Sequence, residues 1–398
     1  MFPFTIRTCI QTLVIVALFS LSLAFDRKIS SALNPGCESD ACSSDSTTLV
    51  YVQAIGSHDT VHQIWDFTRG IPTVIFAITG TAANLSIGWH GSQPDRFNWT
   101  EKPKYSFAVI FDKLYEYNDL KDIGYITPDT PQHSYSLEAL EWSRTHILFS
   151  DEEVELELKG RWGRHSEPRR DGYIGVKLDV LPYTDYALDL PHLIHSANST
   201  LLDLALVGLG TRPGYNSSRF AWSTTVITTD AGSPSLDLNT RRSLDDEHTP
   251  GVFEIVEIRT AESVSRGDGG FLQYRPVAYT GPGRGVASST PARHAAPNTT
   301  TIPPRSTAAI YYGDKTARAQ ALLVSFGESA DGFYAKSNYT AWSLTVGYGV
   351  PPVEGFSLFV IIIISIGLGV PVLLALSGIV YVISRRRRNG ARRFDNED

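Results

Sequence analysis

Cysteine is scarce in this chain, which has three among its 398 residues. Cys9 lies in the N-terminal leader described below, so Cys37 and Cys42 are the two that remain. Their CESDAC spacing does not fit a zinc knuckle, and no nearby histidine completes a metal site. A disulfide between them would close a small local loop in an oxidising compartment. The fold must therefore depend on its hydrophobic core, with little help from cross-links.

The chain also lacks the short motifs that mark many active sites. It has no G-x-S-x-G nucleophile elbow, and its glycine-rich GPGRGVAS run does not precede a helix as a phosphate loop would. His192 and His195 form an H-x-x-H pair, but the glutamate of the metalloprotease pattern H-E-x-x-H is missing. Ordinary histidines are the favoured interpretation, also for His58 and His62. We therefore predict a protein that is not an enzyme and that needs no metal or cofactor.

One dense cluster of ionisable residues, at positions 245–248, leaves two interpretations open. Asp245, Asp246 and His248 could serve in acid–base catalysis or bind calcium. A charged turn that pairs with Arg241 and Arg242 is the simpler alternative, and it is favoured because exposed charge runs are usually solvated.

Long hydrophobic runs mark the two ends of the chain. Near the N-terminus, Arg7 precedes an apolar run, and the small residues Ser22 and Ala24 stand before Phe25. This arrangement predicts a cleaved signal peptide over residues 1–24, since the run is too short to cross about 30 Å of hydrocarbon. Near the C-terminus, residues 356–383 carry no charge and are long enough for one transmembrane helix. Residues 384–398 then form a short tail.

The predicted transmembrane helix has two further features. Ser365, Gly367 and Gly369 would let a second helix pack closely in lipid, although glycine is also common in membrane helices generally. Pro371 is expected to kink the helix. The tail begins with Arg385, Arg386, Arg387 and Arg388. Such a cluster stays on the cytoplasmic side, where anionic lipid headgroups are favoured over nucleic acid as its partner.

An acidic segment with many glycan acceptor sites lies between the two ends. Residues 25–355 hold 28 basic and 39 acidic residues, a net charge of −11, which disfavours nucleic-acid binding. The segment has six N-x-S/T sequons, at Asn84, Asn98, Asn198, Asn216, Asn298 and Asn338. Six sequons behind a signal peptide predict a glycoprotein of the secretory pathway.

Short strands dominate the segment. Apolar and polar residues alternate with a period of two near residues 154–158, 174–180 and 202–206, which predicts half-buried strands. Continuous apolar runs predict buried strands at 49–55, 73–79, 106–111, 253–258, 321–326 and 342–346. Residues 136–144 are the best candidate for an amphipathic helix. Many short strands separated by turn residues predict an all-β luminal domain built from antiparallel, sandwich-like lobes.

The segment is expected to divide into two such lobes. Prolines near residues 183–195 interrupt the strand pattern, which suggests lobe 1 over residues 49–190 and lobe 2 over residues 191–355. Residues 281–307 are rich in Gly, Pro, Ser and Thr and are expected to form a disordered insertion. The Ser-rich residues 25–48 are expected to be a flexible N-terminal segment for the same reason.

Several long stretches resemble, in the same order, those of the glycosylated lysosomal membrane protein family. They are SFAVIFDKLYEY (106–117), LLDLALVGLGTRPGYNSS (201–218), SLDDEHTPGVFEIVEI (243–258), FLQYRPVAYT (271–280) and AWSLTVGYGVPPVEGFS (341–357). The length, the signal peptide and the C-terminal span agree as well. Two features depart from the vertebrate members: the tail has no tyrosine or dileucine sorting motif, and the luminal cysteines of those relatives are absent.

The resemblance implies a type I protein of the lysosomal membrane with a glycosylated luminal β domain. It further implies an accessory subunit of a multi-span major-facilitator transporter that exports dipeptides. This subunit would protect the transporter from luminal proteases and help to keep it in lysosomes. Two alternatives stay open: a cell-surface or endosomal adhesion or receptor-type ectodomain, and a tethered luminal hydrolase that uses the cluster at 245–248.

Overall fold

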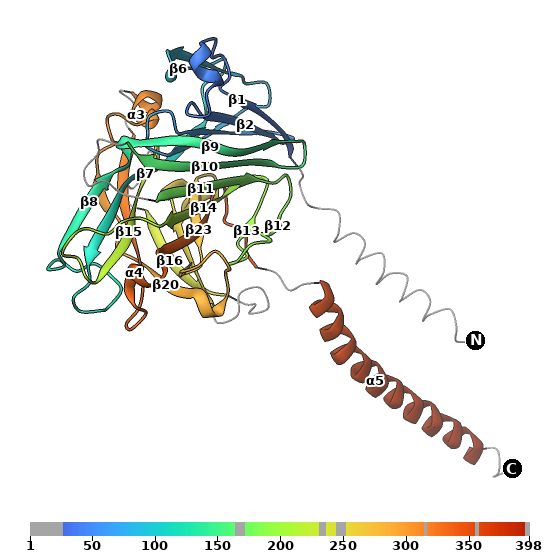
Figure 1. Ribbon diagram of the computed structural model, residues 1–398. Helices are drawn as coiled ribbons and strands as arrows, with labels where there is room; N and C mark the ends of the chain where they lie inside the picture. The colour runs from blue at the N-terminus through green and yellow to red at the C-terminus, as the bar shows by residue number, and fades with distance from the viewer. Residues whose placement is uncertain are drawn as a thin grey trace. The chain divides into compact units, whose positions relative to one another are not determined.

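The computed structural model describes residues 27–163, 172–230, 236–243, 252–313, 317–354 and 358–394. The chain divides into two compact units, one that ends at Val353 and one that begins at Glu354. The first is built almost entirely from β-strands, and the second contains one long helix (Figure 1). The predicted signal peptide and the cluster at 245–248 lie outside the described residues.

The first of two large antiparallel sheets begins with the N-terminal strands. In spatial order its strands are β1 (Lys28–Leu33), β2 (Leu49–Ile55), β3 (Thr60–Asp66), β4 (Thr73–Thr79), β7 (Tyr105–Asn118), β15 (Ser218–Thr228) and β22 (Arg318–Phe326). Two short strands, β8 (Gln132–Ser136) and β21 (Asn298–Thr300), pair with β7 and β22.

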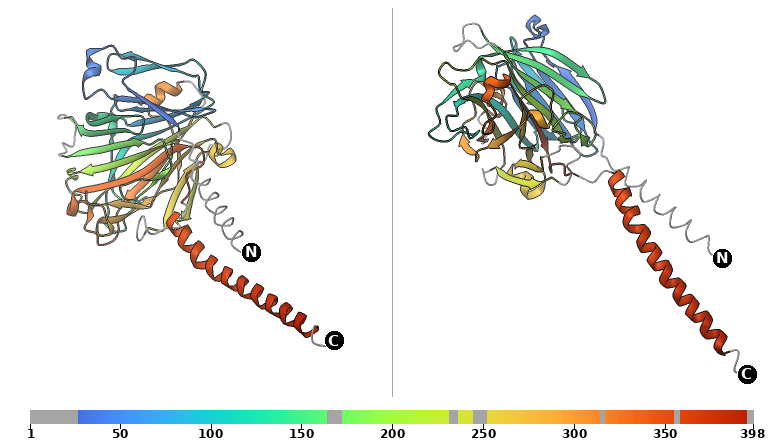
Figure 2. Two further views of the ribbon diagram at one scale, coloured as in Figure 1. Left: turned by 90° about the vertical axis from the view of Figure 1, so that its right-hand side faces the viewer. Right: turned by 60° about the horizontal axis from the view of Figure 1, so that its bottom comes forward.

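The second large sheet packs against the first (Figure 2). In spatial order its strands are β9 (Leu140–Phe149), β10 (Val154–Trp162), β11 (Tyr173–Val180), β14 (Ser199–Val207), β23 (Tyr339–Tyr348), β18 (Gly270–Tyr274), β17 (Glu254–Arg259) and β16 (Asp237–Arg242). The predicted antiparallel sandwich is thus confirmed.

One corner joins the two sheets. Strand β20 (Ser289–His294) pairs with β22 of the first sheet and with β19 (Val277–Tyr279), and β19 also pairs with β23 of the second sheet. The hydrogen-bonded network is therefore continuous over 19 strands. Residues 281–307 were expected to be disordered, and this expectation is wrong. They contain β20 and β21, because the backbone of β22 provides pairing partners that composition alone does not reveal.

The division into two lobes is also wrong. Strand β15 from the second half of the chain pairs with β7 from the first half, and β14 pairs with both β11 and β23. Strands from either side of residue 190 thus pair with each other in both sheets, and the described residues up to Val353 form one unit. Long-range strand pairing overrides the local break that the prolines create.

The main core lies between the sheets. Its largest fully buried side chains include Trp65 and Trp222 from the first sheet and Trp342 from the second. Because strands of both sheets contribute inward residues to this core, burial of its apolar area at about 25 cal/mol per Å² is the chief stabilising term. The predicted half-buried strands show the expected alternation: β10, β11 and β14 bury every second residue.

A second, smaller core covers the outer face of the first sheet. There α3 (Thr307–Tyr312) and the hairpin of β5 (Leu85–His90) and β6 (Gln93–Trp99) pack on Ile64, Ile75 and Ile110. Both faces of β3, β4 and β15 are therefore buried. This double coverage explains the continuous apolar run of β4, a pattern that strands of parallel sheets usually show.

Two local expectations need correction. Residues 136–144 do not form a helix: they hold the short 3₁₀ turn η2 (Leu137–Ala139) and the start of β9. Leu137 and Leu140 have helical spacing, but both are buried in the sandwich core instead. The segment before residue 49 contains β1 and the 3₁₀ turn η1 (Asp40–Ser43), and a disulfide links Cys37, which precedes this turn, to Cys42 within it. The pairing of β1 with β2 orders it.

A buried cation ties three segments of the sandwich together. Arg219 on β15 is 3 % exposed; its Nε donates to Asp119 at 2.9 Å, and its Nη2 to Asp122 at 2.6 Å. The same guanidinium binds Asp331, beside α4 (Phe333–Ser337), and lies over the Phe333 ring. An arginine that pairs with three carboxylates, of which Asp119 is buried, is costly to remove, because each carboxylate would lose its counter-charge.

Helix α5 (Leu358–Phe394) makes up the second unit. Among the described residues, one helical stretch, Val360–Arg386, is long and apolar enough to cross a membrane. It contains Ser365, Gly367 and Gly369, and the helix continues through Pro371. The arginine cluster 385–388 continues the same helix, so the charged residues follow the apolar stretch directly.

Candidate functional site

The outer face of the second sheet carries a dense arrangement of charged side chains. On β10 and β11 the period-two alternation that buries the leucines and valines turns the intervening charged residues outward. The register places Glu155 opposite Asp179, and Lys177 opposite both Glu157 and Asp203. Strand pairing thus brings together charges that are far apart in the sequence.

Lys177 is the central cation of this face. Its Nζ lies 3.5 Å from Glu155 Oε1 and 3.4 Å from Asp179 Oδ2. His146 on β9 approaches Glu155 from the other side, with 3.9 Å between Nε2 and Oε1. The paired carboxylates raise the pKa of Lys177 and outweigh the opposing effect of its burial, so the ammonium stays charged.

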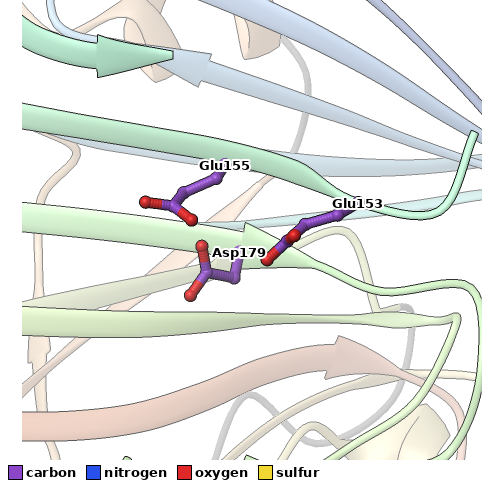
Figure 3. A group of neighbouring side chains, drawn as sticks. All are labelled: Glu153, Glu155 and Asp179. Atoms are coloured by element: carbon purple, nitrogen blue, oxygen red, sulfur yellow. The ribbon is translucent and has the colours of Figure 1, made fainter. Parts of the chain in front are cut away.

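Three carboxylates gather around this lysine. Glu153, Glu155 and Asp179 each offer an oxygen, and these oxygens lie within 4.8 Å of one another (Figure 3). Burial raises the pKa of the Asp179 carboxyl to about 7. Repulsion from Glu155 and Glu153 also raises this pKa, and the attraction of Lys177 lowers it. Asp179 Oδ1 is buried and has no hydrogen-bond partner among the described residues. Asp179 is therefore a carboxyl group on this face whose raised pKa lets it change charge near neutral pH.

This cluster is the one group of potential metal ligands that the described part of the chain brings together. Carboxylate oxygens are the ligands that Ca²⁺ and Mg²⁺ prefer. The ammonium of Lys177, however, already lies against two of the three carboxylates. A divalent ion would have to displace that charge, so the geometry fits a lysine–carboxylate network better than a metal centre.

A cavity of about 350 Å³ opens beside the cluster. The short hairpin of β12 (Asp185–Tyr186) and β13 (Ile194–His195) and its connecting loop cover it, and the outer face of β11 and β14 forms its floor. Apolar lining residues come mostly from the loop, whereas the floor is charged. The residues that line it include Glu153, Lys177, Asp179, Asp185, Leu188, Asp189, Leu190, His195, Asp203, Arg284 and Ser343.

Arg284 holds the wall of this cavity in place. Its guanidinium binds Asp203, donates to Leu190 O at 2.6 Å and to Ser343 Oγ at 2.9 Å, and lies over the Tyr279 ring. Ser343 Oγ in turn donates to Asp203 Oδ1 at 2.6 Å. Arg284 comes from the glycine-rich run that the sequence analysis assigned to a disordered insertion. The loop over the cavity is thus fastened to the sheet through Arg284, whose charge pair with Asp203 is partly buried.

The two histidines of the H-x-x-H pair stabilise the hairpin and do not converge on a metal. His192 Nδ1 lies 2.7 Å from Ala187 O, and His195 Nδ1 lies 3.1 Å from Tyr183 O. Burial lowers the pKa of His195, so this imidazole is neutral near pH 7. His62 is similarly structural: it lies between Tyr51 Oη and Thr79 Oγ1, and burial lowers its pKa to about 4.

The sequon asparagines lie around the rest of the sandwich. Asn84 and Asn98 are neighbours on the β5–β6 hairpin, where Thr100 N donates to Asn84 O at 3.0 Å. The exposed sequon asparagines are Asn84, Asn98, Asn216, Asn298 and Asn338. Asn198 is half-buried, and its Oδ1 is enclosed. Glycan attachment at these residues stays a prediction, as does helix packing through Ser365, Gly367 and Gly369.

The cavity and the cluster beside it were not predicted from the sequence. The alternation near residues 154–158 turns Glu155 and Glu157 away from the core, but it does not show that Asp179 lies opposite Glu155. The available signal was the matching alternation of residues 154–158 and 174–180, which suits an antiparallel pair. The register of that pair, and the contribution of Arg284, required the structure.

The fold and the apolar helix define a membrane-tethered β-sandwich protein, with exposed glycan acceptor sequons on the sandwich. The model of one family, described as glycosylated lysosomal membrane protein, matches residues 48–389, and the chain belongs to this family. Glycosylated lysosomal membrane protein A of Xenopus laevis is 30% identical over 380 residues, which cover 91% of each chain. The Danio rerio protein is 28% identical over 389 residues (94% of this chain, 92% of the relative). The Homo sapiens protein is 25% identical over 344 residues (83% and 82%).

Proposed function

We propose that this protein is a non-enzymatic accessory subunit of a multi-span major-facilitator transporter of dipeptides in the lysosomal membrane. It protects the transporter from luminal proteases and supports its location in lysosomes. Membership of a family of lysosomal membrane glycoproteins carries this proposal. The exposed sequons on a compact β-sandwich support it further, because bulky glycans obstruct the extended backbone that proteases need.

The proposed topology is type I, with the β-sandwich in the lumen and the C-terminus in the cytosol. It is supported by the arginines at 385–388, which directly follow the apolar stretch and are retained on the cytoplasmic side. Anionic headgroups are the partner proposed for these arginines. Ser365, Gly367 and Gly369 are proposed to pack against a helix of the transporter.

Removal of this protein from cells tests the proposal. We expect the abundance of a multi-span transporter, identified by co-purification in mild detergent, to fall when this protein is absent. Inhibitors of lysosomal proteases should restore that abundance, since the loss is proteolytic. Unchanged transporter abundance in cells without the protein would contradict the accessory role.

A receptor-type ectodomain at the cell surface or in endosomes is the second candidate. The cavity over β11 and β14 favours it, because a pocket of about 300–1,000 Å³ is the usual size of a ligand site. Biotinylation of intact cells separates the two functions: a receptor is labelled mostly at the surface, and the accessory subunit is protected inside.

A further inference from the structure

We infer that the acidic mouth of the cavity and the adjoining outer face of β9, β10 and β11 form the docking site for a protein partner that presents lysine or arginine side chains. This inference rests on the proposed function and names the surface through which it is carried out. The partner is defined by chemistry: a luminal protein surface with basic side chains beside an apolar recess.

The distribution of sequons leaves this face open. Consecutive sequons lie at Asn98 and Asn198, so residues 99–197 contain none. That stretch contains β9, β10, β11 and the hairpin over the cavity. The exposed sequons belong to the β5–β6 hairpin, the β14–β15 loop, β21 and the turn before β23. A protein can therefore approach β9–β11 without meeting a sugar chain that is attached to that face.

The charge of the face defines the partner. Lys177 and Arg284 are already neutralised, the first by Glu155 and Asp179 and the second by Asp203. Around the same cavity, Glu153, Asp185 and Asp189 have no cation within 4 Å among the described residues. Three carboxylates without close counter-ions attract basic groups, and such complementarity sets both the rate and the specificity of association.

An exposed apolar residue adds an anchor. Leu188, in the loop that covers the cavity, is 96 % exposed, and Tyr183 nearby is 41 % exposed. A leucine that projects fully into solvent beside charged groups contributes favourably to the free energy of binding when a partner covers it. Interfaces commonly combine such a central apolar contact with a charged rim. Arg284 holds this loop to the sheet through its hydrogen bond to Leu190 O, so Leu188 lies on a segment whose position is fixed.

The cavity itself is of a size to take one basic side chain. At about 350 Å³ it lies at the small end of ligand pockets, which run from about 300 to 1,000 Å³. Its apolar wall, which includes Leu190, suits the methylene stem of a lysine or arginine, and its acidic mouth suits the charged end.

Two variants of the full-length protein test this docking site. Glu153→Lys combined with Asp189→Lys reverses the charge at the mouth. Leu148→Asn creates the sequon N-F-S at residues 148–150 and places a glycan on β9 directly opposite Glu155, at a residue that is 39 % exposed. Matched controls are Asp129→Lys, an exposed carboxylate, and Gln132→Asn, which creates the sequon N-H-S on β8 of the first sheet.

Each variant is expressed in cells, and the multi-span protein that co-purifies with it in mild detergent is quantified. We expect at least a tenfold loss for both site variants and less than a twofold change for both controls. A glycosidase-sensitive mobility shift shows that each new sequon is used, and export from the endoplasmic reticulum shows that each variant folds. A carbodiimide, which condenses carboxylates with amines, should join Glu153, Asp185 or Asp189 of the wild type to lysines of the partner.

The outcomes separate the two hypotheses. If the wild type retains a transporter and both site variants retain it within twofold, the docking site is wrong and the accessory function stands. If the wild type retains no multi-span protein, the accessory function fails and the docking site fails with it. Loss in the site variants alone, with lysine cross-links to the captured transporter, supports both.

Discussion

Replacement of Asp179 by asparagine should remove a pH dependence from the stability of the sandwich. Burial raises the pKa of this carboxyl from 3.8 to about 7. The folded state therefore binds a proton more tightly than the unfolded state, and the unfavourable contribution of the ionised carboxylate grows as pH rises from about 4 to about 7. The wild type should thus lose stability at neutral pH relative to Asp179→Asn, in which the side chain is always neutral.

The magnitude follows from the two pKa values. Each pH unit between them changes the free energy of unfolding by about 1.4 kcal/mol, so the interval from pH 5 to pH 7 corresponds to about 3 kcal/mol. The Asp179 side chain is 16 % exposed, so solvent screening reduces this value only in part. Other titrating groups, such as the buried His62, are present in both proteins, and their contributions cancel in the difference.

Urea unfolding of the detergent-solubilised full-length protein, followed by the fluorescence of its seven tryptophans, measures this difference at pH 5.0 and pH 7.5. We expect the free energy of unfolding of Asp179→Asn minus that of the wild type to be about 2–3 kcal/mol larger at pH 7.5 than at pH 5.0, so that the variant is the more stable protein at neutral pH. Asp129→Asn, at an exposed carboxylate, is the control. A difference that is the same at both pH values within about 0.5 kcal/mol would refute the reasoning.

Three further predictions concern the rest of the sandwich. Arg219→Met should destabilise the protein by about 3–5 kcal/mol in urea, since Asp119 and Asp331 would be left without their counter-charge; Arg219→Lys should restore part of the loss. Gly160→Ala should cost about 1–3 kcal/mol, because a Cβ there would lie 2.8 Å from the Trp142 ring, whereas Gly210→Ala meets open space and serves as its control. Substitution by glutamine should increase electrophoretic mobility at each of the five exposed sequons but leave it unchanged at the enclosed Asn198; a shift at Asn198 would contradict this.

The strands were predictable where the local pattern and the tertiary environment agree. Residues 49–55 and 73–79 match β2 and β4 at both ends, because these two strands are mostly apolar and are largely buried on both faces. The alternation near residues 154–158 and 174–180 matches β10 and β11, which have one buried and one polar face.

Prediction failed where a segment depends on a distant partner. Residues 281–307 have the composition of a loop, yet Thr290 and Ala292 are buried because β20 pairs with β19 and β22. The candidate site was not predictable for the same reason. Its key contacts, between Arg284 and Asp203 and between Lys177 and Asp179, depend on strand register and on a loop that is anchored over the sheet. Neither follows from a pattern within one short window of sequence.

The corner at β19, β20 and β22 has a consequence for how the sandwich comes apart. Because the backbone hydrogen bonds pass from one sheet to the other there, neither sheet can separate without breaking bonds that belong to its neighbour. Opening of the sandwich is therefore expected to be cooperative, with few partly opened states. In a compartment rich in hydrolases, the paired strands of such a sandwich become cleavable only when it unfolds globally, so the lifetime of these strands is governed by the rate of that rare event.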